Sequence, residues 1–327
     1  MNLGKLKTGY LEYLEIEKDR SQKTIENYDH YLERFLKWAK ISSPGDITDE
    51  LVRNYRLHLN RLSDREGKPA STRSTRVGRG RPLKRITQNY HIIALRNFLK
   101  YLAKRNVKTL AAEKVELGKT SQRQIDFLEI EEIERMFEAA SLAESRRAAG
   151  TSLKSLRDRA ILELLFSSGL RVSELVSLNR DQVNLKTGEF SVRGKGGKVR
   201  VVFVSEQAKS ALEKYLERRG DVDPALFIRV GIKHLEKKNK SGDLRITPRT
   251  IQRIVKFYAT KAGIVKDVHP HTLRHSFATD LIQSGADIRS VQEMLGHSSV
   301  TTTQVYTHVT NKQLKEVHKA FHGRRRK

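Results

Sequence analysis

The stretch HPHTLRHSFATDLIQSGADIRSVQEMLGHSSVTTTQVYTH, residues 269 to 308, carries most of the polar chemistry of the C-terminal half of the chain. Apolar residues recur three and four positions apart in its first part, which predicts a helix with one buried face. His271 and Arg274 stand three apart on that helix and therefore share a face. His297 and Tyr306 follow after further short apolar pieces, so no single helix joins the four polar residues. The fold has to bring them together.

The composition indicates two domains and a polyanionic partner. A chain of 327 residues exceeds the size at which a single core usually stops growing. The net charge of +26, from 64 basic and 38 acidic side chains, favours nucleic acid as the partner. The absence of cysteine excludes disulfides, thiol nucleophiles and Cys-based zinc sites. No apolar run approaches a membrane span and the N-terminus lacks a signal-peptide core, so we expect a soluble, cytoplasmic protein without a membrane partner.

The first domain, residues 1–118, is predicted to be an all-helical bundle. Apolar stripes follow three candidate caps, Ser21, Thr48 and Thr87. Between the second and third helices lies a basic loop, residues 64–85, with too few apolar residues to bury a core. It is either a solvated insertion or an arm that tracks DNA. Its candidate DNA-binding residues are Arg73, Arg76, Arg79, Arg81, Lys84 and Arg85. Residues 110–124 suit an exposed linker, with the domain boundary near Lys119.

The second domain, residues 119–327, is predicted to be mixed but mainly α, with a small antiparallel sheet. An apolar helix over 156–166 ends at Ser167-Ser168-Gly169, and two β-type runs over 189–204 flank a glycine-lysine turn typical of a hairpin. A helix over 206–218 follows. Thr247-Pro248 is the expected start of another helix, with Thr as the cap and Pro at the first helical position. Two polar insertions, residues 143–152 and 229–245, interrupt this pattern.

The polar residues suit the transfer of a phosphodiester. That reaction needs donors for the phosphate oxygens, a nucleophile, a base and an acid. Arg171 and Arg274 offer forked donors that match phosphate geometry, although either arginine alone would more often be a surface charge. The spacing of His271 and His275, four apart, suits zinc, but no acidic residue lies between them and Arg274 adds positive charge, which disfavours a zinc site. We therefore expect no metal.

The motifs resemble the catalytic set of the tyrosine recombinase (phage integrase) family, and are most similar to those of Xer-type recombinases. The resemblance spans residues 127 to 308, whereas over residues 1–110 it rests only on a helical bundle of suitable size. It implies a SAM-like core-binding bundle and a catalytic domain with the DNA breaking-rejoining fold. The matching residues are Arg171 in RVSEL, Lys195 in GKGGK, His271 and Arg274 in HTLRH, His297 in LGHSS and Tyr306 in TTTQVYTHV.

The resemblance also implies a role for each residue. Tyr306 would attack the scissile phosphate to form a 3′-phosphotyrosyl link, with His271 as base and Lys195 as acid. His297 would hydrogen-bond a phosphate oxygen, and Glu174 would orient the site. No cofactor is needed because the link stores the bond energy, and the sequence has no nucleotide-binding glycine loop.

Several alternatives to these roles stay open. Lys198 could replace Lys195 as the acid, since both lie in one turn, and Tyr306 could be a core aromatic. His275 and His308 fit structural or phosphate-contacting roles better than catalytic ones. Lys198 and Arg200 are further candidates for DNA contacts.

The function implied is Xer-like site-specific recombination through a Holliday junction, which resolves chromosome or plasmid dimers. The alternatives are a mobile-element integrase, a type IB topoisomerase-like relaxing enzyme and a non-catalytic DNA-binding protein. A C-terminal helix with Leu314, Val317 and Phe321 on one face would dock on a neighbouring protomer in a tetramer on DNA, or else pack on its own domain. Accessory proteins are left open.

Overall fold

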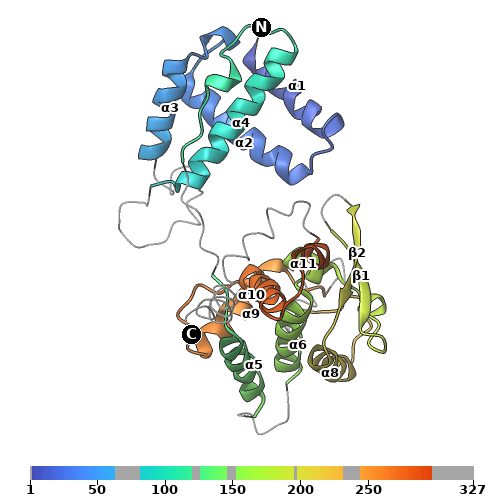
Figure 1. The fold of residues 1–327 in the computed structure, drawn as a ribbon. Coiled ribbons are helices and arrows are strands. Elements are labelled where there is room, and N and C mark those ends of the chain that lie inside the picture. The colour runs from blue at the N-terminus through green and yellow to red at the C-terminus, as the bar shows by residue number, and fades with distance from the viewer. Residues whose placement is uncertain are drawn as a thin grey trace, which may run out of the picture. The chain divides into compact units, whose positions relative to one another are not determined.

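The computed structural model describes residues 2–62, 82–119, 126–145, 152–194, 197–230 and 244–296. The chain forms two compact units, Met1–Arg123 and Gln124–Lys327 (Figure 1). The boundary expected near Lys119 stays a prediction, because residues 120–125 lie outside the described ranges. No helix in the described part of the chain is long and apolar enough to cross a membrane.

The N-terminal unit is a helical bundle, as predicted. Its described helices are α1 (Leu3–Ile16), α2 (Gln22–Ala39), α3 (Asp49–Arg61) and α4 (Arg85–Lys104), with short 3-10 turns η1 (Pro44–Asp46) and η3 (Ala112–Lys114). Helix α4 packs against the other three. The apolar stripes read from the sequence form the core, in which aromatic rings are prominent: the Tyr10 ring lies 5.4 Å from Phe98 and 5.1 Å from Tyr101, between centroids.

Two expectations for this unit are wrong. Helix α4 begins at Arg85 with Lys84 as its N-cap, so Thr87 lies inside the first turn, where its carbonyl contacts the His91 ring. The predicted linker does not start at residue 110, because Ala112 and Val115 are buried in the bundle core. The segment predicted as a linker has too few apolar residues to show a helical or strand period, but those it has pack against the bundle. Residues 63–81 of the basic loop lie outside the described residues.

In the C-terminal unit, α6 (Leu153–Ser168) is the central helix. It packs against α5 (Ile130–Ser145), α8 (Glu206–Glu217), α9 (Pro248–Lys261) and α10 (Pro270–Gln283). A helix surrounded in this way buries side chains on several sides, and α6 buries Arg157, Asp158 and Glu163 besides its apolar residues. It ends at Gly169, whose φ of 58° favours glycine, and a Cβ there would lie 2.5 Å from the Phe277 ring.

The predicted hairpin is present as an antiparallel pair. Strand β1 (Glu189–Arg193) pairs with β2 (Val199–Phe203), with Phe190 opposite Val202 and Val192 opposite Arg200. Phe190, Val192 and Val202 are buried, and Val199, Val201 and Phe203 face solvent. Because side chains alternate along a strand, Arg200 shares the inward face with Val202. The sequence-based fold class, a helical bundle plus a mainly helical unit with a small sheet, is confirmed.

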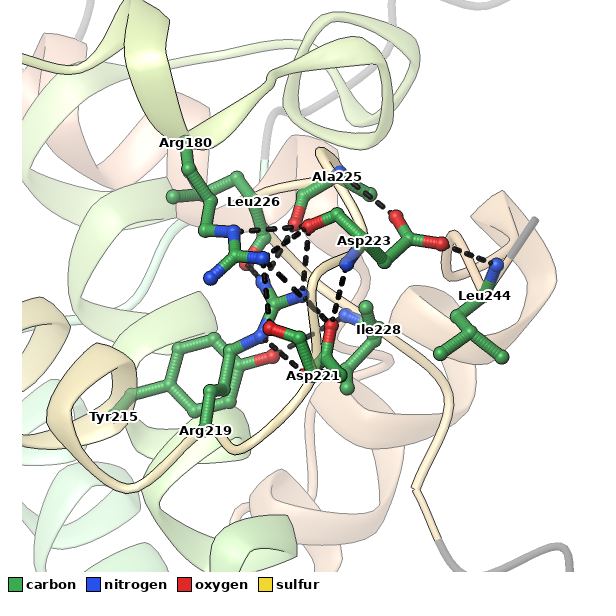
Figure 2. Close-up of polar contacts among 9 residues, drawn as sticks. All are labelled: Arg180, Tyr215, Arg219, Asp221, Asp223, Ala225, Leu226, Ile228 and Leu244. Atoms are coloured by element: carbon green, nitrogen blue, oxygen red, sulfur yellow. Dashed lines mark hydrogen bonds and ion pairs between the residues drawn. The ribbon is translucent and has the colours of Figure 1, made fainter. Parts of the chain in front are cut away.

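The connection that follows α8 is organised by a network of hydrogen bonds around Arg219 (Figure 2). The Arg219 guanidinium donates to the carbonyls of Ala225 and Leu226 at 2.6 and 3.0 Å, and pairs with Asp221. The Asp223 carboxylate accepts from the N–H groups of Ala225 and Leu244, both at 2.8 Å. The network therefore ties together the two chain segments on either side of residues 231–243, which are not described.

Candidate active site

Arg171 is fixed at the start of the short helix α7 (Val172–Ser177), directly after the turn at Gly169. It is the N-cap residue, and its backbone N–H donates to Glu174 Oε2 at 2.8 Å. Its guanidinium donates to Glu174 Oε1, also at 2.8 Å. This is one half of a capping box, in which the residue at N3 reaches back to the N-cap N–H, and an ion pair stands in for the other half because an arginine side chain has no acceptor. The Arg171 side chain stays 27% exposed, so a solvent-borne group can reach it.

Arg274 on α10 is buried, whereas His271 on the same helix is exposed. The Arg274 guanidinium donates to the carbonyls of Gly169 and, at 2.6 Å, of Leu295. The sequence predicts that the two residues share a face of the helix but does not predict that Arg274 is buried among the neighbouring elements. A forked guanidinium can bridge two main-chain acceptors, which makes burial of its charge tolerable.

The C-terminal end of α11 (Ile288–Leu295) is held by arginines from three elements. Arg200 donates to Met294 O at 3.0 Å, Arg274 to Leu295 O, and Arg171 to Gly296 O at 3.1 Å. The last carbonyls of a helix lack intrahelical partners and carry partial negative charge, so cations are favoured there. These contacts fix the point at which the chain leaves α11, immediately before His297 in sequence.

Glu174 links two of these arginines. Arg200 donates to Glu174 Oε1 at 3.0 Å and to Oε2 at 2.8 Å, which makes the pair bidentate. Burial alone would raise the pKa of Glu174, but hydrogen bonds from Arg200 and Arg171 lower it to about 2. The carboxylate is therefore ionised at neutral pH. The guanidinium of Arg200, a predicted DNA contact, instead binds Glu174 and Met294 O.

His271 is neutral at neutral pH and can accept a proton. Partial desolvation of its ring lowers the pKa of His271, as does the proximity of Arg274, His269 and Arg171. Its ring centroid lies 6.3 Å from that of His269 and 6.5 Å from that of His275. His269 is the N-cap of α10, where its Nδ1 accepts from the Thr272 N–H. Burial is the main cause that lowers the pKa of His275 to about 4, and the nearby His271, Arg274 and His269 lower it further.

The structure brings Arg171, Glu174, His271 and Arg274 into one unit, with α7 and α10 joined through the turn at Gly169 and the end of α11. Lys198, Lys84 and Arg85 are exposed, as DNA-contacting residues must be. The remaining predicted residues lie outside the described residues and stay predictions: Lys195, His297, Tyr306, Arg73, Arg76, Arg79 and Arg81. The sequence analysis did not identify the role of Arg200. Side chains alternate along a strand, so the position of Arg200 two residues before the apolar Val202 could have indicated that both face the interior.

Comparisons with known proteins find matches over both units. Residues 126–313 match the phage integrase family, and residues 8–106 match the phage integrase N-terminal SAM-like domain. Tyrosine recombinase XerD of Oceanobacillus iheyensis is 33% identical over 323 residues, covering 96% of this chain and 97% of that protein. Tyrosine recombinase XerC of Thermodesulfovibrio yellowstonii is 35% identical over 318 residues, covering 96% and 95%.

Solved structures share the fold. The XerH site-specific recombinase bound to palindromic difH substrate matches with a TM-score of 0.67 at 23% identity, over 92% of this chain and 80% of that chain. A lambda integrase dimer bound to a COC' core site matches with a TM-score of 0.67 at 17% identity, over 94% and 95%. Together with the matched family models and the near full-length Xer relatives, the observations establish that this chain belongs to the phage integrase family and is a tyrosine site-specific recombinase.

Proposed function

We propose that this recombinase cleaves and rejoins duplex DNA through a 3′-phosphotyrosyl link at Tyr306, and exchanges strands through a Holliday junction. The observation that carries the proposal is the fixed pair of arginines: Arg171 and Arg274 arise from different helices but both donate to carbonyls at the end of α11. Donors held in place before the reaction stabilise developing charge without reorganising. A scissile phosphate needs such donors.

The remaining roles follow from chemistry and from the family motifs. A phenol with a pKa near 10 is a weak nucleophile at neutral pH and needs a base. His271 is suited to take the Tyr306 proton because its lowered pKa leaves the ring unprotonated at neutral pH and the residue is exposed. Lys195 protonates the leaving 5′ oxygen, and His297 donates to a phosphate oxygen. The covalent link conserves the bond energy, so no nucleotide cofactor or metal is required.

We propose a tetramer on DNA, joined by the C-terminal helix of each protomer. Support comes from a groove of about 660 Å³ between α5, α6 and α10. Its apolar floor includes Phe137, Phe166 and Phe277, and its rim carries Glu134, Glu138 and Asp280. The sequence from residue 311 to 327 combines three apolar residues, Leu314, Val317 and Phe321, with many lysines and arginines. An acid-rimmed apolar groove suits such a segment. The lambda integrase tetramer bound to a Holliday junction has the same fold.

The biological role we propose is the resolution of chromosome or plasmid dimers in the cytoplasm. The support is that relatives named XerC and XerD cover nearly the whole chain. Mobile-element integration would use the same chemistry. Mapping covalent protein–DNA adducts on the genome of the host separates the two: a single site near the replication terminus favours dimer resolution, and sites at element ends favour integration.

The test of the chemistry uses the full chain and nicked duplexes that trap the covalent intermediate. Wild type should form a denaturant-resistant protein–DNA adduct, and Tyr306→Phe should bind the same DNA but form none. Tyr13→Phe is the matched control, because Tyr13 packs against Tyr10 and Tyr101 in the N-terminal bundle. An adduct that persists in Tyr306→Phe would overturn the choice of nucleophile. Plasmid relaxation without recombinant products would favour a topoisomerase.

A further inference from the structure

Arg200 is the arginine of this site that the family motifs do not include. It lies on β2, and its side chain is 10% exposed, against 5% for its partner Glu174. All three of its donor nitrogens are engaged: Nε with Met294 O, and the two terminal nitrogens with Glu174. The residue therefore joins the hairpin, the first turn of α7 and the end of α11 in one cluster.

The charges of this cluster decide what Arg171 can offer to a phosphate. Glu174 Oε1 accepts from Arg171 at 2.8 Å and from Arg200 at 3.0 Å. The pair Arg171 and Glu174 alone has a net charge of zero, whereas the triad with Arg200 has a net charge of +1. Because the carboxylate is buried, its field is poorly screened and would act strongly on Arg171 if Arg200 were absent.

Exposure shows which member of the triad meets the substrate. Arg171 is 27% exposed, and both Glu174 and Arg200 are nearly enclosed. Arg200 offsets the charge of Glu174 on the enclosed side of the carboxylate. The more exposed guanidinium of Arg171 then keeps a net positive charge that can attract an anion. Glu174 can then act as a rigid support for Arg171 without cancelling its charge.

We propose that Arg200 is a positioning residue of the cleavage reaction, which offsets the charge of Glu174 so that Arg171 presents a net positive charge to the scissile phosphate. By binding Met294 O, it also fixes the hairpin that carries Lys195 to the end of α11, which precedes His297 in sequence. This inference rests on the proposed function, because it needs phosphodiester cleavage by this site.

The first test compares two arginines of the same hairpin. Arg200→Gln keeps an amide donor near Glu174 but removes the charge, and we expect adduct formation to slow about 100-fold, as for loss of one preorganised donor, with DNA affinity little changed. Arg193→Gln removes an equal charge from an exposed position on β1 and should stay within about twofold of wild type. Thermal unfolding followed by circular dichroism checks that both variants fold.

The second test separates charge from mere support. In Glu174→Gln/Arg200→Gln the uncompensated carboxylate is gone, so the double variant should form adduct at least about tenfold faster than Arg200→Gln. Arg200→Lys, which keeps the charge without the fork, should also exceed Arg200→Gln. A purely structural role predicts the opposite: the double variant, with fewer hydrogen bonds, would be as slow as Arg200→Gln or slower.

The outcomes distinguish this inference from the function on which it rests. If wild type forms no adduct on any substrate, the proposed function fails. If wild type reacts and Arg200→Gln reacts equally fast, the positioning role is overturned while the function stands. A slow Arg200→Gln that neither the double variant nor Arg200→Lys improves overturns the charge argument.

Discussion

The two units differ in what they bury. Among the described residues of the N-terminal unit, His91 is the one buried polar or charged side chain apart from tyrosines, and aromatic rings fill much of the core. The C-terminal unit buries a set of charged side chains. That set is Arg157, Asp158, Glu163, Glu174, Arg219 and Arg274. One unit is held mainly by apolar contact, and the other adds arginines bound to carboxylates and main-chain carbonyls.

The difference follows from what each unit has to position. A helical bundle that only presents a surface needs rigid packing, which apolar side chains supply. A site for phosphate chemistry needs positive charges fixed in space before substrate arrives. In the function we propose, Arg274 would meet that need, because a guanidinium carries five donors and a charge that persists at all relevant pH values. The cost is that removing one arginine leaves several buried acceptors unpaired.

The largest expected effect is the loss of a buried arginine from the network in Figure 2. Arg219→Met should destabilise the C-terminal unit by about 4 kcal/mol, because Asp221 and the carbonyls of Ala225 and Leu226 lose their charged donor. Urea unfolding followed by far-ultraviolet circular dichroism measures the change across both units.

Trp38 provides the control for this variant. It is the one tryptophan of the chain and packs against Tyr55 and His58 in the N-terminal unit, with ring centroids 5.2 and 5.4 Å away. Its fluorescence therefore reports unfolding of that unit. The Trp38 transition should stay at the same urea concentration in Arg219→Met. A parallel shift of both transitions would show that the two units unfold together and would contradict their separate stabilisation.

The next largest effect is the response of the N-terminal unit to acid. Burial lowers the pKa of His91 to about 4, from an ordinary value of 6.5, and the neutral ring binds Thr87 O through Nδ1. The unfolded chain therefore takes up a proton before the folded unit does. The stability that the neutral His91 ring contributes to the N-terminal unit is complete above its ordinary pKa of 6.5. It is lost as the pH falls toward about 4. From about pH 7 to pH 5 the loss should be about 2 kcal/mol.

The Trp38 transition measured across that pH range tests the response. His91→Gln, which cannot titrate, should remove most of the slope, because the nearby Arg34 stays charged and His30 is less enclosed. If the His91→Gln transition keeps the wild-type slope, the buried histidine is not the cause of the acid sensitivity.

The smallest effect should come from a polar contact within the apolar unit. Tyr28→Phe removes the hydrogen bond that Asn97 Nδ2 donates to the Tyr28 hydroxyl at 2.9 Å. The contact is only partly buried, so water can replace the lost acceptor and the cost should be about 1 kcal/mol. Trp38 fluorescence in urea gives the value. A loss comparable to that of Arg219→Met would abolish the distinction between the two units.

The same contrast explains what the sequence could predict. Apolar periods located α2, α3 and most of α4, and the caps Thr48 and Thr247 with Pro248 marked helix starts correctly. Glycine at the end of α6 and the alternation around the turn at residue 197 were also readable. Each of these signals depends on residues that are close together in the sequence, so it can be recognised without knowledge of the fold. The start of α4 was misjudged because Thr87 is a better cap by type than Lys84, which the structure uses.

The contacts that the buried arginines make with main-chain carbonyls cannot be recognised from neighbouring residues in this way. Every residue offers a carbonyl, so nothing in the sequence tells that Arg274 binds Leu295 O or that Arg219 binds Ala225 O. Burial of Arg274 and the inward turn of Arg200 therefore had to come from coordinates. For the site, the motifs selected Arg171, His271 and Arg274 by resemblance, and the structure then supplied the carbonyl contacts that hold the two arginines.

The most direct measurement of the central claim is to identify the residue that becomes joined to DNA. The trapped adduct of the full-length wild-type protein is digested with protease and nuclease, and the nucleotide-bearing peptide is sequenced by mass spectrometry. We expect a single modified peptide with the nucleotide on Tyr306, linked through a 3′ phosphate. A nucleotide on any other side chain, or a 5′ linkage, would contradict it.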